Sequence, residues 1–513
     1  MNYKKLGQIL GKIMILESIL MLFPLIVSFI YKEGNRHVLS FLIPILILLG
    51  LGCWLQIPKP SRNNLYQKEG FALTALVWVV MATFGALPFV INGDIPNYVD
   101  ALFEIMSGFT TTGSSILTDV TTLSHASLFW RSFSHWIGGM GVLVFVLIFI
   151  PESNDGSSMH LLRAESPGPQ VGKIASKMKA TAGILYLIYL GMTVLVAILL
   201  MLDKPISGYE NDKFFISILT AFGCAGTGGF GLIPGSLELY NPYSQYVVAI
   251  SLIFFGSNFT LYYLILIGQM KNVIRSEELR TYLAMVTIAI GLVFFSLVSG
   301  FWEIPQDYTA EEAFRHSLFQ VATLVSTAGF STTDFNVWPM MAQMVLLIMM
   351  FTGGMAGSTA GGTKISRSVI AFKGAYINVR KLINPRYVPK AKFEGKTLES
   401  RVINDVFAYF TLYLFIVLIT LVILSFDPVN GTITTIVSDA GTYTVEHSFY
   451  SNFTAIIACL CNIGPGFEAV SAYAGFANYS ILSKLVLTVA MMAGRLEILP
   501  VLILFSKRTW SKM

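Results

Sequence analysis

Residues 100–113 read DALFEIMSGFTTTG, and this stretch decides the fold because the chain repeats its plan three more times. In each copy an acidic residue precedes a run of apolar or amphipathic residues, and a string of small residues then ends in glycine. A long apolar stretch stands before and after every copy, so the sequence predicts four fused units of span, short helix, glycine loop and span. The other copies are 212–228 (DKFFISILTAFGCAGTG), 311–329 (EEAFRHSLFQVATLVSTAG) and 446–464 (EHSFYSNFTAIIACLCNIG).

The helix predicted inside each copy is too short to cross a bilayer, which needs roughly 20 apolar residues, so it is typical of a re-entrant element. The acid at its first turn suits the positive end of the helix dipole. The partly negative carboxyl ends would then point inward, where a cation could lie. Non-helical backbone at membrane depth is tolerated only where protein buries it or where it lines a watery cavity. The four loops are therefore expected to form a ring.

The composition is that of an integral membrane protein. Of the 513 residues, 54% are hydrophobic and only 12% are charged, against about 25% charged in soluble domains. This balance excludes an ordinary soluble enzyme, a disordered chain and a nucleic-acid-binding protein. Ten spans are predicted near residues 6–30, 38–57, 70–91, 127–150, 180–202, 243–269, 282–302, 402–426 and 481–505, and from about 337, where glycines interrupt the apolar stretch.

The basic residues indicate the orientation of the chain. Because basic loops stay in the cytoplasm, both termini are predicted to be cytoplasmic. The opposite face is richer in acids, which would either concentrate cations or simply reflect the retention of basic loops; both interpretations stay open. Most of the 34 Lys and Arg residues fall in the segments 1–12, 56–69, 151–180, 271–280, 364–401 and 506–513, which the ten spans place on one side.

The four glycine loops carry no charged residue, so they cannot select an ion by charged side chains. A ring of backbone carbonyls replaces the hydration shell of a large monovalent cation without formal charge, and glycine permits the backbone conformations that such a ring needs. The alternative is four separate helix ends with capping glycines, but the fourfold recurrence favours a potassium filter. Its predicted ligands are Thr110, Thr111, Thr112 and Gly113; Ala225, Gly226, Thr227 and Gly228; Ser326, Thr327, Ala328 and Gly329; and Cys461, Asn462, Ile463 and Gly464.

The interrupted span beginning near residue 337 is expected to break, because each glycine costs up to about 1 kcal/mol inside a helix. Ser358, Thr359 and Thr363 could offer polar contacts there to ions or to the pore wall. A tight crossing of small-residue helices is the alternative, although the glycines crowd several faces. The break contains Gly353, Gly354, Gly357, Gly361 and Gly362 and ends at Lys364.

Arg495 lies inside the last apolar stretch, in AGRLEILP. An arginine at membrane depth is costly and marks a partner, a pathway or a water-filled cavity. If Arg495 faced the pore, its charge would add a barrier beneath the filter. A buried pair with a carboxylate, or a side chain that reaches the cytoplasmic surface, is the alternative.

The whole chain resembles the TrkH/TrkG–KtrB–HKT superfamily of potassium transporters, and within it the TrkH-type members. The resemblance rests on SGFTTTG at 107–113, AGTGGF at 225–230, STAGFST at 326–332, GSNFTLYY at 256–263 and GGMAGSTAGGTK at 353–364. It implies an all-α integral membrane protein with four fused units around one pseudo-fourfold pore, preceded by two extra helices. The corresponding segments are 1–57 for the extra helices, 68–150, 176–270, 280–382 and 400–505 for the units, and 506–513 for the tail.

The resemblance also implies roles for particular residues. The glycine-rich loop 353–362 would obstruct the pore and move to open it, and Arg495 would face the pore and help to hold that loop closed. Members with serine at the first filter glycine tend to admit sodium, whereas Gly113 is glycine here. The fourth loop departs most from the family pattern, since Asn462 replaces threonine and Pro465 follows the glycine. A somewhat different ligand geometry is therefore expected in that loop.

The implied partners are a TrkA-like cytosolic nucleotide-binding subunit, docked on the cytoplasmic loops, and a second copy of the chain in a homodimer. The implied location is the bacterial cytoplasmic membrane, with K⁺ as the transported ion and no bound cofactor. Two alternatives remain: a KtrB-like carrier stimulated by sodium, and a polytopic membrane enzyme. The enzyme would need clustered His, Asp or Ser at membrane depth, whereas the polar residues here are mainly threonines of the glycine loops.

Overall fold

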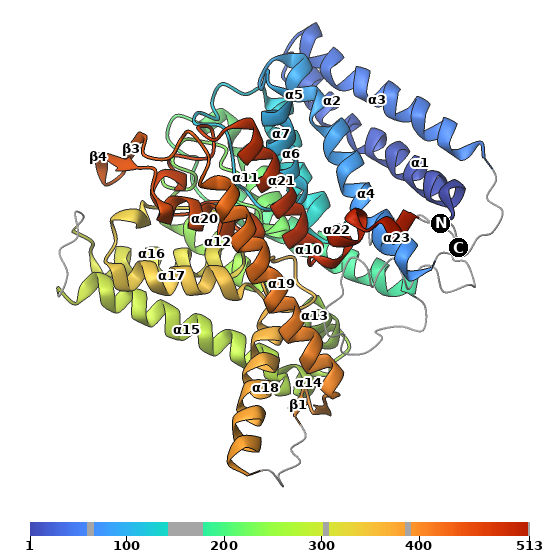
Figure 1. Cartoon of the computed structure of the whole chain (residues 1–513). Coiled ribbons are helices and arrows are strands. Elements are labelled where there is room, and N and C mark those ends of the chain that lie inside the picture. Colours follow the sequence, from blue (N-terminus) through green and yellow to red (C-terminus); the bar gives the residue numbers. More distant parts are fainter. Residues whose placement is uncertain (59–65, 142–177, 301–306, 385–390, 511–513) are drawn as a thin grey trace.

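The computed structural model describes residues 1–58, 66–141, 178–300, 307–384 and 391–510. Within these ranges the chain is mostly helical, with two short hairpins, so the expected all-α class needs a small correction (Figure 1). The strands are β1 (Lys392–Phe393) paired with β2 (Lys396–Thr397), and β3 (Ile433–Ser438) paired antiparallel with β4 (Gly441–Glu446).

The chain begins with helices that pack beside the first unit. Helices α1 and α3 lie against each other, with Gly11 and Gly52 at the point where the two backbones approach closely. The chain termini lie close together in Figure 1, and the Tyr3 hydroxyl donates a hydrogen bond to the Trp510 carbonyl at 2.6 Å. The first helices are α1 (Tyr3–Leu20), α2 (Leu22–Ile30), α3 (Asn35–Gln56), α4 (Gln67–Gly85) and α5 (Leu87–Asn92).

Four helices of 12 to 16 residues lie where the short helices are expected, each with a helix before and after it. They are α6 (Tyr98–Phe109), α11 (Lys213–Gly226), α16 (Ala310–Val325) and α20 (Phe449–Leu460). The preceding helices are α4 with α5, α10 (Met178–Met201), α15 (Glu277–Val298) and α19 (Ser400–Leu424). The following helices are α7 (His125–Gly139), α12 (Pro242–Phe255), α17 (Met340–Thr352) and α21 (Ile481–Arg495).

Each short helix also packs against the helix that ends the unit before it. Helix α11 contacts α7, α16 contacts α12, and α20 contacts α17. Helix α21, at the end of the last unit, packs on α6 of the first unit. The units therefore follow one another in a closed circle, which brings the carboxyl ends of the short helices together.

Three of the expected spans are not continuous helices. The stretch 243–269 bends by 90° between α12 and α13 (Phe259–Leu266), at Gly256, Ser257 and Asn258. The stretch 481–505 breaks between α21 and α22 (Leu499–Phe505), where Glu497 and Ile498 adopt positive φ. The glycine-rich stretch breaks as expected, between α17 and α18 (Ile365–Ile383). The remaining short helices are α14 (Met270–Arg275) and α23 (Lys507–Trp510).

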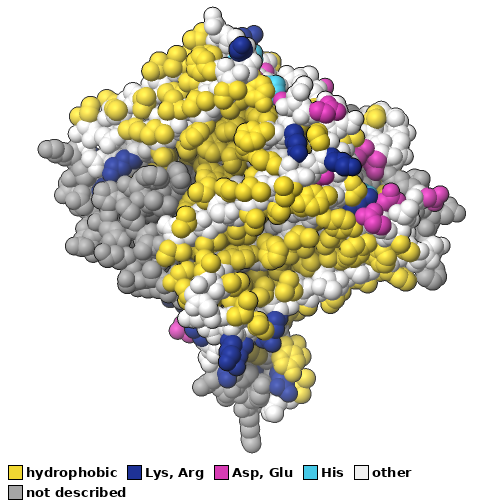
Figure 2. Space-filling model, turned by 180° about the vertical axis from the view of Figure 1, so that it is seen from behind, with side chains coloured by type: hydrophobic (Ala, Val, Ile, Leu, Met, Phe, Trp, Pro, Cys, Tyr) yellow, Lys and Arg dark blue, Asp and Glu magenta, His cyan; other side chains and the backbone are white. Residues whose placement is uncertain are grey.

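The described residues contain six helices long and apolar enough to cross a membrane, or seven if the bent α12–α13 pair is counted. The expected span 127–150 lies only partly inside the described ranges, since α7 ends at Gly139 and the description stops at residue 141. Hydrophobic side chains cover a broad band of the face in Figure 2, and Lys and Arg gather at its lower end. Such an apolar exterior fits contact with lipid chains.

A buried ion pair joins the first short helix to its neighbours. Arg131 on α7 contacts Glu104 on α6 at 2.7 Å, and both side chains are almost completely buried. The other Glu104 oxygen accepts hydrogen bonds from the Ile116 amide at 3.0 Å and the Ser115 hydroxyl at 3.1 Å. The Arg131 guanidinium also lies 4.0 Å from the Phe230 ring centre in the second unit. This acid therefore has a structural role and does not add to a cation-attracting surface.

Replacing Glu104 by glutamine keeps the side-chain shape but leaves the Arg131 charge buried without a counterion. Breaking a buried ion pair in this way costs about 3–5 kcal/mol. We expect Glu104→Gln to lower the melting temperature of the detergent-solubilised protein, measured by tryptophan fluorescence. The exposed Asp119, changed to asparagine, provides the control. Equal melting temperatures for the two variants would contradict this role.

Candidate functional site

The four short helices end in the same local geometry. In each case an amide just beyond the helix, on the third residue after α6, α16 and α20 and on the second after α11, donates to a carbonyl five residues earlier. This bond satisfies a carbonyl that a helix end would leave unpaired. The bonds run from Thr112 to Ser107, from Gly228 to Gly223, from Ala328 to Thr323 and from Ile463 to Ala458, with lengths of 2.8, 2.9, 2.8 and 2.8 Å.

The second loop differs from the sequence expectation by one residue. One residue in each of the four loops, the second position of the loop, has a left-handed backbone with φ between 52° and 57°. These residues are Thr111, Thr227, Thr327 and Asn462. Aligned on this position, the second loop is Gly226–Gly229, where Gly226 is also the last residue of α11 and Ala225 lies inside its last turn. Two adjacent glycines in AGTGGF left this register ambiguous in the sequence.

The four loops contact one another in chain order. A β-carbon placed on Gly113 would lie 2.7 Å from the Gly229 nitrogen, and one on Gly229 would lie 2.5 Å from the Gly329 carbonyl carbon. A β-carbon on Gly329 would meet Pro465, and one on Gly464 would lie 2.8 Å from the Thr112 carbonyl oxygen. Such distances leave no room for a larger residue. The glycines are therefore required where neighbouring backbones approach, and the loops form a closed circle.

The polar side chains of the loops are buried and partly tied to one another. Thr110 and Thr112 share a hydrogen bond of 2.7 Å. The Asn462 amide nitrogen donates to Thr112 and to the Met491 carbonyl, each at 2.9 Å. Asn462 keeps the backbone conformation of the threonines it replaces, while its amide braces the first loop. Among the described residues, the Asn462 amide oxygen and the Thr111 hydroxyl are buried without a hydrogen-bond partner.

The glycine-rich segment 353–364 lies directly against the helix ends that lead into two of these loops. The Gly361 amide donates to the Thr327 hydroxyl at 2.5 Å, and the Gly362 amide donates to the Cys461 carbonyl at 2.9 Å. A β-carbon on Gly361 would lie 2.9 Å from the Asn462 β-carbon. The structure therefore brings the expected gate residues and the third and fourth loops together.

The same segment is fastened to the bend between α12 and α13. The Met355 amide donates to the Gly256 carbonyl at 2.9 Å, and the Phe259 amide donates to the Gly357 carbonyl at 3.0 Å. The Glu278 carboxylate on α15 accepts from the Ala356 amide at 2.8 Å. Sequence reasoning missed these residues, although the small polar run Gly256–Ser257–Asn258 inside an apolar stretch was a signal for a bend.

The polar side chains of the segment bond to backbone carbonyls, partly of the segment itself and partly of the neighbouring helices α17 and α12. The Ser358 and Thr363 hydroxyls donate to the Met355 and Phe351 carbonyls at 2.7 and 2.8 Å. The Thr359 hydroxyl donates to the Phe255 carbonyl of α12 at 3.1 Å. The Lys364 ammonium donates to the Ala360 carbonyl. These groups hold the segment in place.

Arg495 joins three parts of the chain. Its guanidinium donates to the Thr359 carbonyl of the glycine-rich segment and to the Gly139 carbonyl at the end of α7, each at 2.7 Å. It also donates to the Gly138 carbonyl. Glu497 pairs instead with Arg367 on α18, a pair that the sequence reasoning did not identify. Arg495 is thus anchored by backbone carbonyls of α7 and of the glycine-rich segment.

Comparisons with known proteins cover the whole chain. The family model described as TrkH, cation transport protein, matches residues 37–513. The Trk system potassium uptake protein TrkH of Salmonella typhimurium is 31% identical over 99% of this chain and 100% of its own length. The Escherichia coli Trk system potassium uptake protein TrkG is 32% identical over 98% of this chain and 97% of its own length. The crystal structure of the potassium transporter TrkH from Vibrio parahaemolyticus has a TM-score of 0.82 at 28% identity, with full coverage of both chains.

The close approach of Gly229 to the third loop can be tested by stability. Gly229→Ala places a methyl group against the backbone of the third loop, and overpacking of this kind costs about 1–3 kcal/mol. We expect a lower melting temperature and poorer yield of folded protein. Gly191→Ala on α10 has open space around the new methyl group and improves helix propensity, so it should not destabilise the protein. Similar behaviour of the two variants would refute the assigned close approach.

Proposed function

Because the chain belongs to the TrkH family of cation transport proteins, we propose that it takes up potassium through the ring formed by its four glycine loops. Its relatives are transporters of the Trk potassium uptake system, not enzymes. The observation that carries the proposal is the closed circle of contacts between loops that follow the four short helices. Transport of an ion requires a route at membrane depth, and such loops provide polar backbone there.

Backbone carbonyls of the loops are the proposed ligands of K⁺. The loop residues Thr110–Gly113, Gly226–Gly229, Ser326–Gly329 and Cys461–Gly464 contain no formal charge. Carbonyl oxygens around a narrow axis can replace the water shell of a large monovalent cation. The short helices direct their carboxyl ends, which carry partial negative charge, to the same place. Together these groups favour a cation without binding it irreversibly.

The glycine-rich segment 353–364 is the proposed gate. It is supported by the hydrogen bonds from Gly361 and Gly362 to Thr327 and Cys461, which place it against the ends of two filter helices. Glycines on both sides of the contact allow the backbone to change conformation at low steric cost. Opening would require the segment to give up these two hydrogen bonds and move away from the loops.

Arg495 is proposed to act as a brace and as an electrostatic barrier. Its hydrogen bond to Thr359 holds the gate segment, while its bonds to Gly138 and Gly139 fix it to the first unit. A positive charge below a cation filter raises the energy of a cation at that point. Removal of Arg495 would thus loosen the gate and lower the barrier together.

The proposed orientation in the membrane, the location and the partners follow from the family resemblance and from the distribution of charge. The basic segment 364–401 would lie in the cytoplasm together with both termini, in a bacterial cytoplasmic membrane. A TrkA-like nucleotide-binding subunit would dock on these loops and act on the gate through α18, which directly follows it. A homodimer is the proposed assembly.

Uptake of ⁸⁶Rb⁺ by cells that lack their own potassium uptake systems tests the function. We expect cells that express the chain to accumulate ⁸⁶Rb⁺ above cells with an empty vector, with or without external sodium. Uptake only in the presence of sodium would favour the KtrB-like alternative. No uptake by cells with verified membrane expression would contradict potassium transport.

The barrier role makes a separate prediction. Arg495→Ala should increase ⁸⁶Rb⁺ flux into liposomes that contain the purified protein, because both the charge and the Thr359 brace are lost. The exposed Arg401, changed to alanine, removes one charge elsewhere and should leave flux near the wild-type value. Unchanged flux and selectivity in Arg495→Ala would reject the barrier.

A further inference from the structure

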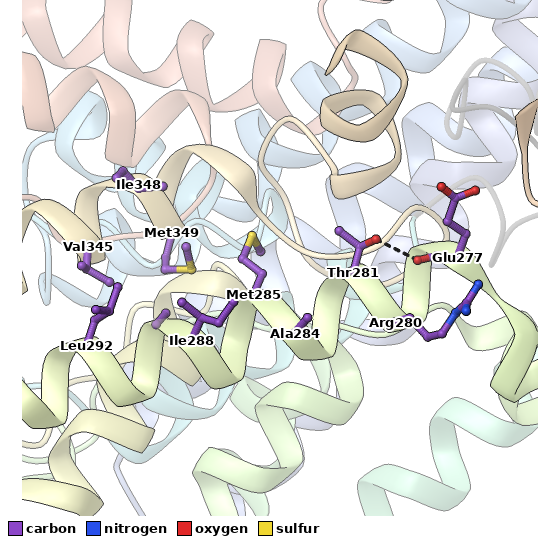
Figure 3. Close-up of a pocket in the computed structure, with 11 residues that line it drawn as sticks. Glu277, Arg280, Thr281, Ala284, Met285, Ile288, Leu292, Val345, Ile348 and Met349 are labelled. Carbon is purple, nitrogen blue, oxygen red and sulfur yellow. Dashed lines mark hydrogen bonds between the residues drawn. The ribbon is translucent and has the colours of Figure 1, made fainter. Parts of the chain in front are cut away.

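A groove lies between α15 and α17 on the outer surface of the third unit (Figure 3). Its volume is about 640 Å³, within the roughly 300–1,000 Å³ of ligand pockets. Met285, Ile288 and Leu292 line it from α15, and Ile348 and Met349 line it from α17. Ile288 and Ile348 are 62% and 56% exposed. The long part of the groove is therefore apolar and open to the surroundings.

One end of the groove is polar and carries a positive charge. Arg280 lines this end, and within the described ranges its guanidinium donates to the backbone carbonyls of Ser276 at 3.3 Å and Arg275 at 3.4 Å. No carboxylate among the described residues forms an ion pair with Arg280. The neighbouring Glu277 is neutralised by Lys373. Of the two charged residues that line the groove, Arg280 is therefore the one without an oppositely charged partner in the described part of the chain.

We propose that this groove binds one anionic phospholipid, with its phosphate at the Arg280 guanidinium and an acyl chain along α15 against α17. The distance from Arg280 to Leu292 along the helix is roughly 18 Å, at 1.5 Å per residue, which suits an extended chain. A phosphate matches the planar donors of arginine, and basic residues at the end of a span attract anionic lipids. The charge at only one end favours a lipid over a uniformly apolar surface of a second chain.

The bound lipid would also bear on the proposed gate, a consequence that rests on the proposed function. Met349 lies in the last turn of α17, and its carbonyl accepts a hydrogen bond from Gly353 at 3.2 Å. Glu278 on α15 accepts from Ala356 of the same segment. The two walls of the groove are thus two of the elements attached to the gate. An acyl chain between them would stabilise one spacing of α15 and α17.

Native mass spectrometry of the full chain, supplied with phosphatidylglycerol or phosphatidylcholine, tests the site without measuring transport. We expect retained phosphatidylglycerol, with retention reduced about fivefold in Arg280→Gln, the effect of one basic residue near an anionic surface. Ile288→Trp should reduce it by filling the groove. Arg275→Gln and Ile419→Trp are matched controls, because both residues are exposed outside the groove, and they should retain lipid as the wild type does.

Equal retention by all four variants and the wild type would overturn the proposal. A smaller dimer fraction in Ile288→Trp, with unchanged lipid retention, would also overturn it and assign the groove to contact between two chains. For the gate consequence, ⁸⁶Rb⁺ flux should depend on phosphatidylglycerol in wild-type liposomes and lose that dependence in Arg280→Gln. Flux equal in both lipids would refute the consequence, whereas absence of flux in every lipid would contradict the proposed function and leave the retention result standing.

Discussion

Backbone that leaves a helix inside a bilayer must find hydrogen-bond partners within the protein, because lipid chains offer none. This constraint acts on four loops of the chain at once. In each loop an amide donates a hydrogen bond to the carbonyl five residues earlier, in the last turns of the preceding helix. The loops then pack backbone against backbone at Gly113, Gly229, Gly329 and Gly464. The closed circle of units is the arrangement in which four non-helical segments bury one another.

The same constraint explains the elements around the loops. The segment 353–364 cannot be helical with its glycines, so its amides donate to Gly256, Thr327, Cys461 and Phe351. The bend at Gly256–Asn258 exposes a carbonyl that accepts one of these bonds. Arg495 supplies donors where α7 ends and where the segment turns. The breaks at 256–258, 353–364 and 496–498 are thus each matched by a donor or an acceptor from another unit, and the proposed gate is one part of this mutual arrangement.

Much of the fold could be predicted, because apolar length and small-residue strings are local properties. The break after Thr352 and the short helices follow from residues next to each other in the chain, whereas the two extra helices before the first unit were implied by the family resemblance. The bend in 243–269 and the break in 481–505 could not be predicted from apolar length. Both depend on partners from distant segments: Gly357 and Met355 hold the first, and Arg367 pairs with Glu497 at the second.

The sequence by itself determined that the chain is a membrane protein, that one motif occurs four times, and that glycine is needed at each copy. Only the tertiary structure decided which glycine of AGTGGF belongs to the second loop, which carbonyls accept hydrogen bonds from Arg495, and which residue pairs with Glu104. Composition and repetition are visible in the sequence because they reflect the cost of placing each residue in a membrane or in a tight backbone contact. Register, ion pairing and the order of units around the circle depend on contacts between residues in different elements, from 27 positions apart for Glu104 and Arg131 to 350 for Thr112 and Asn462, and no local pattern encodes their geometry.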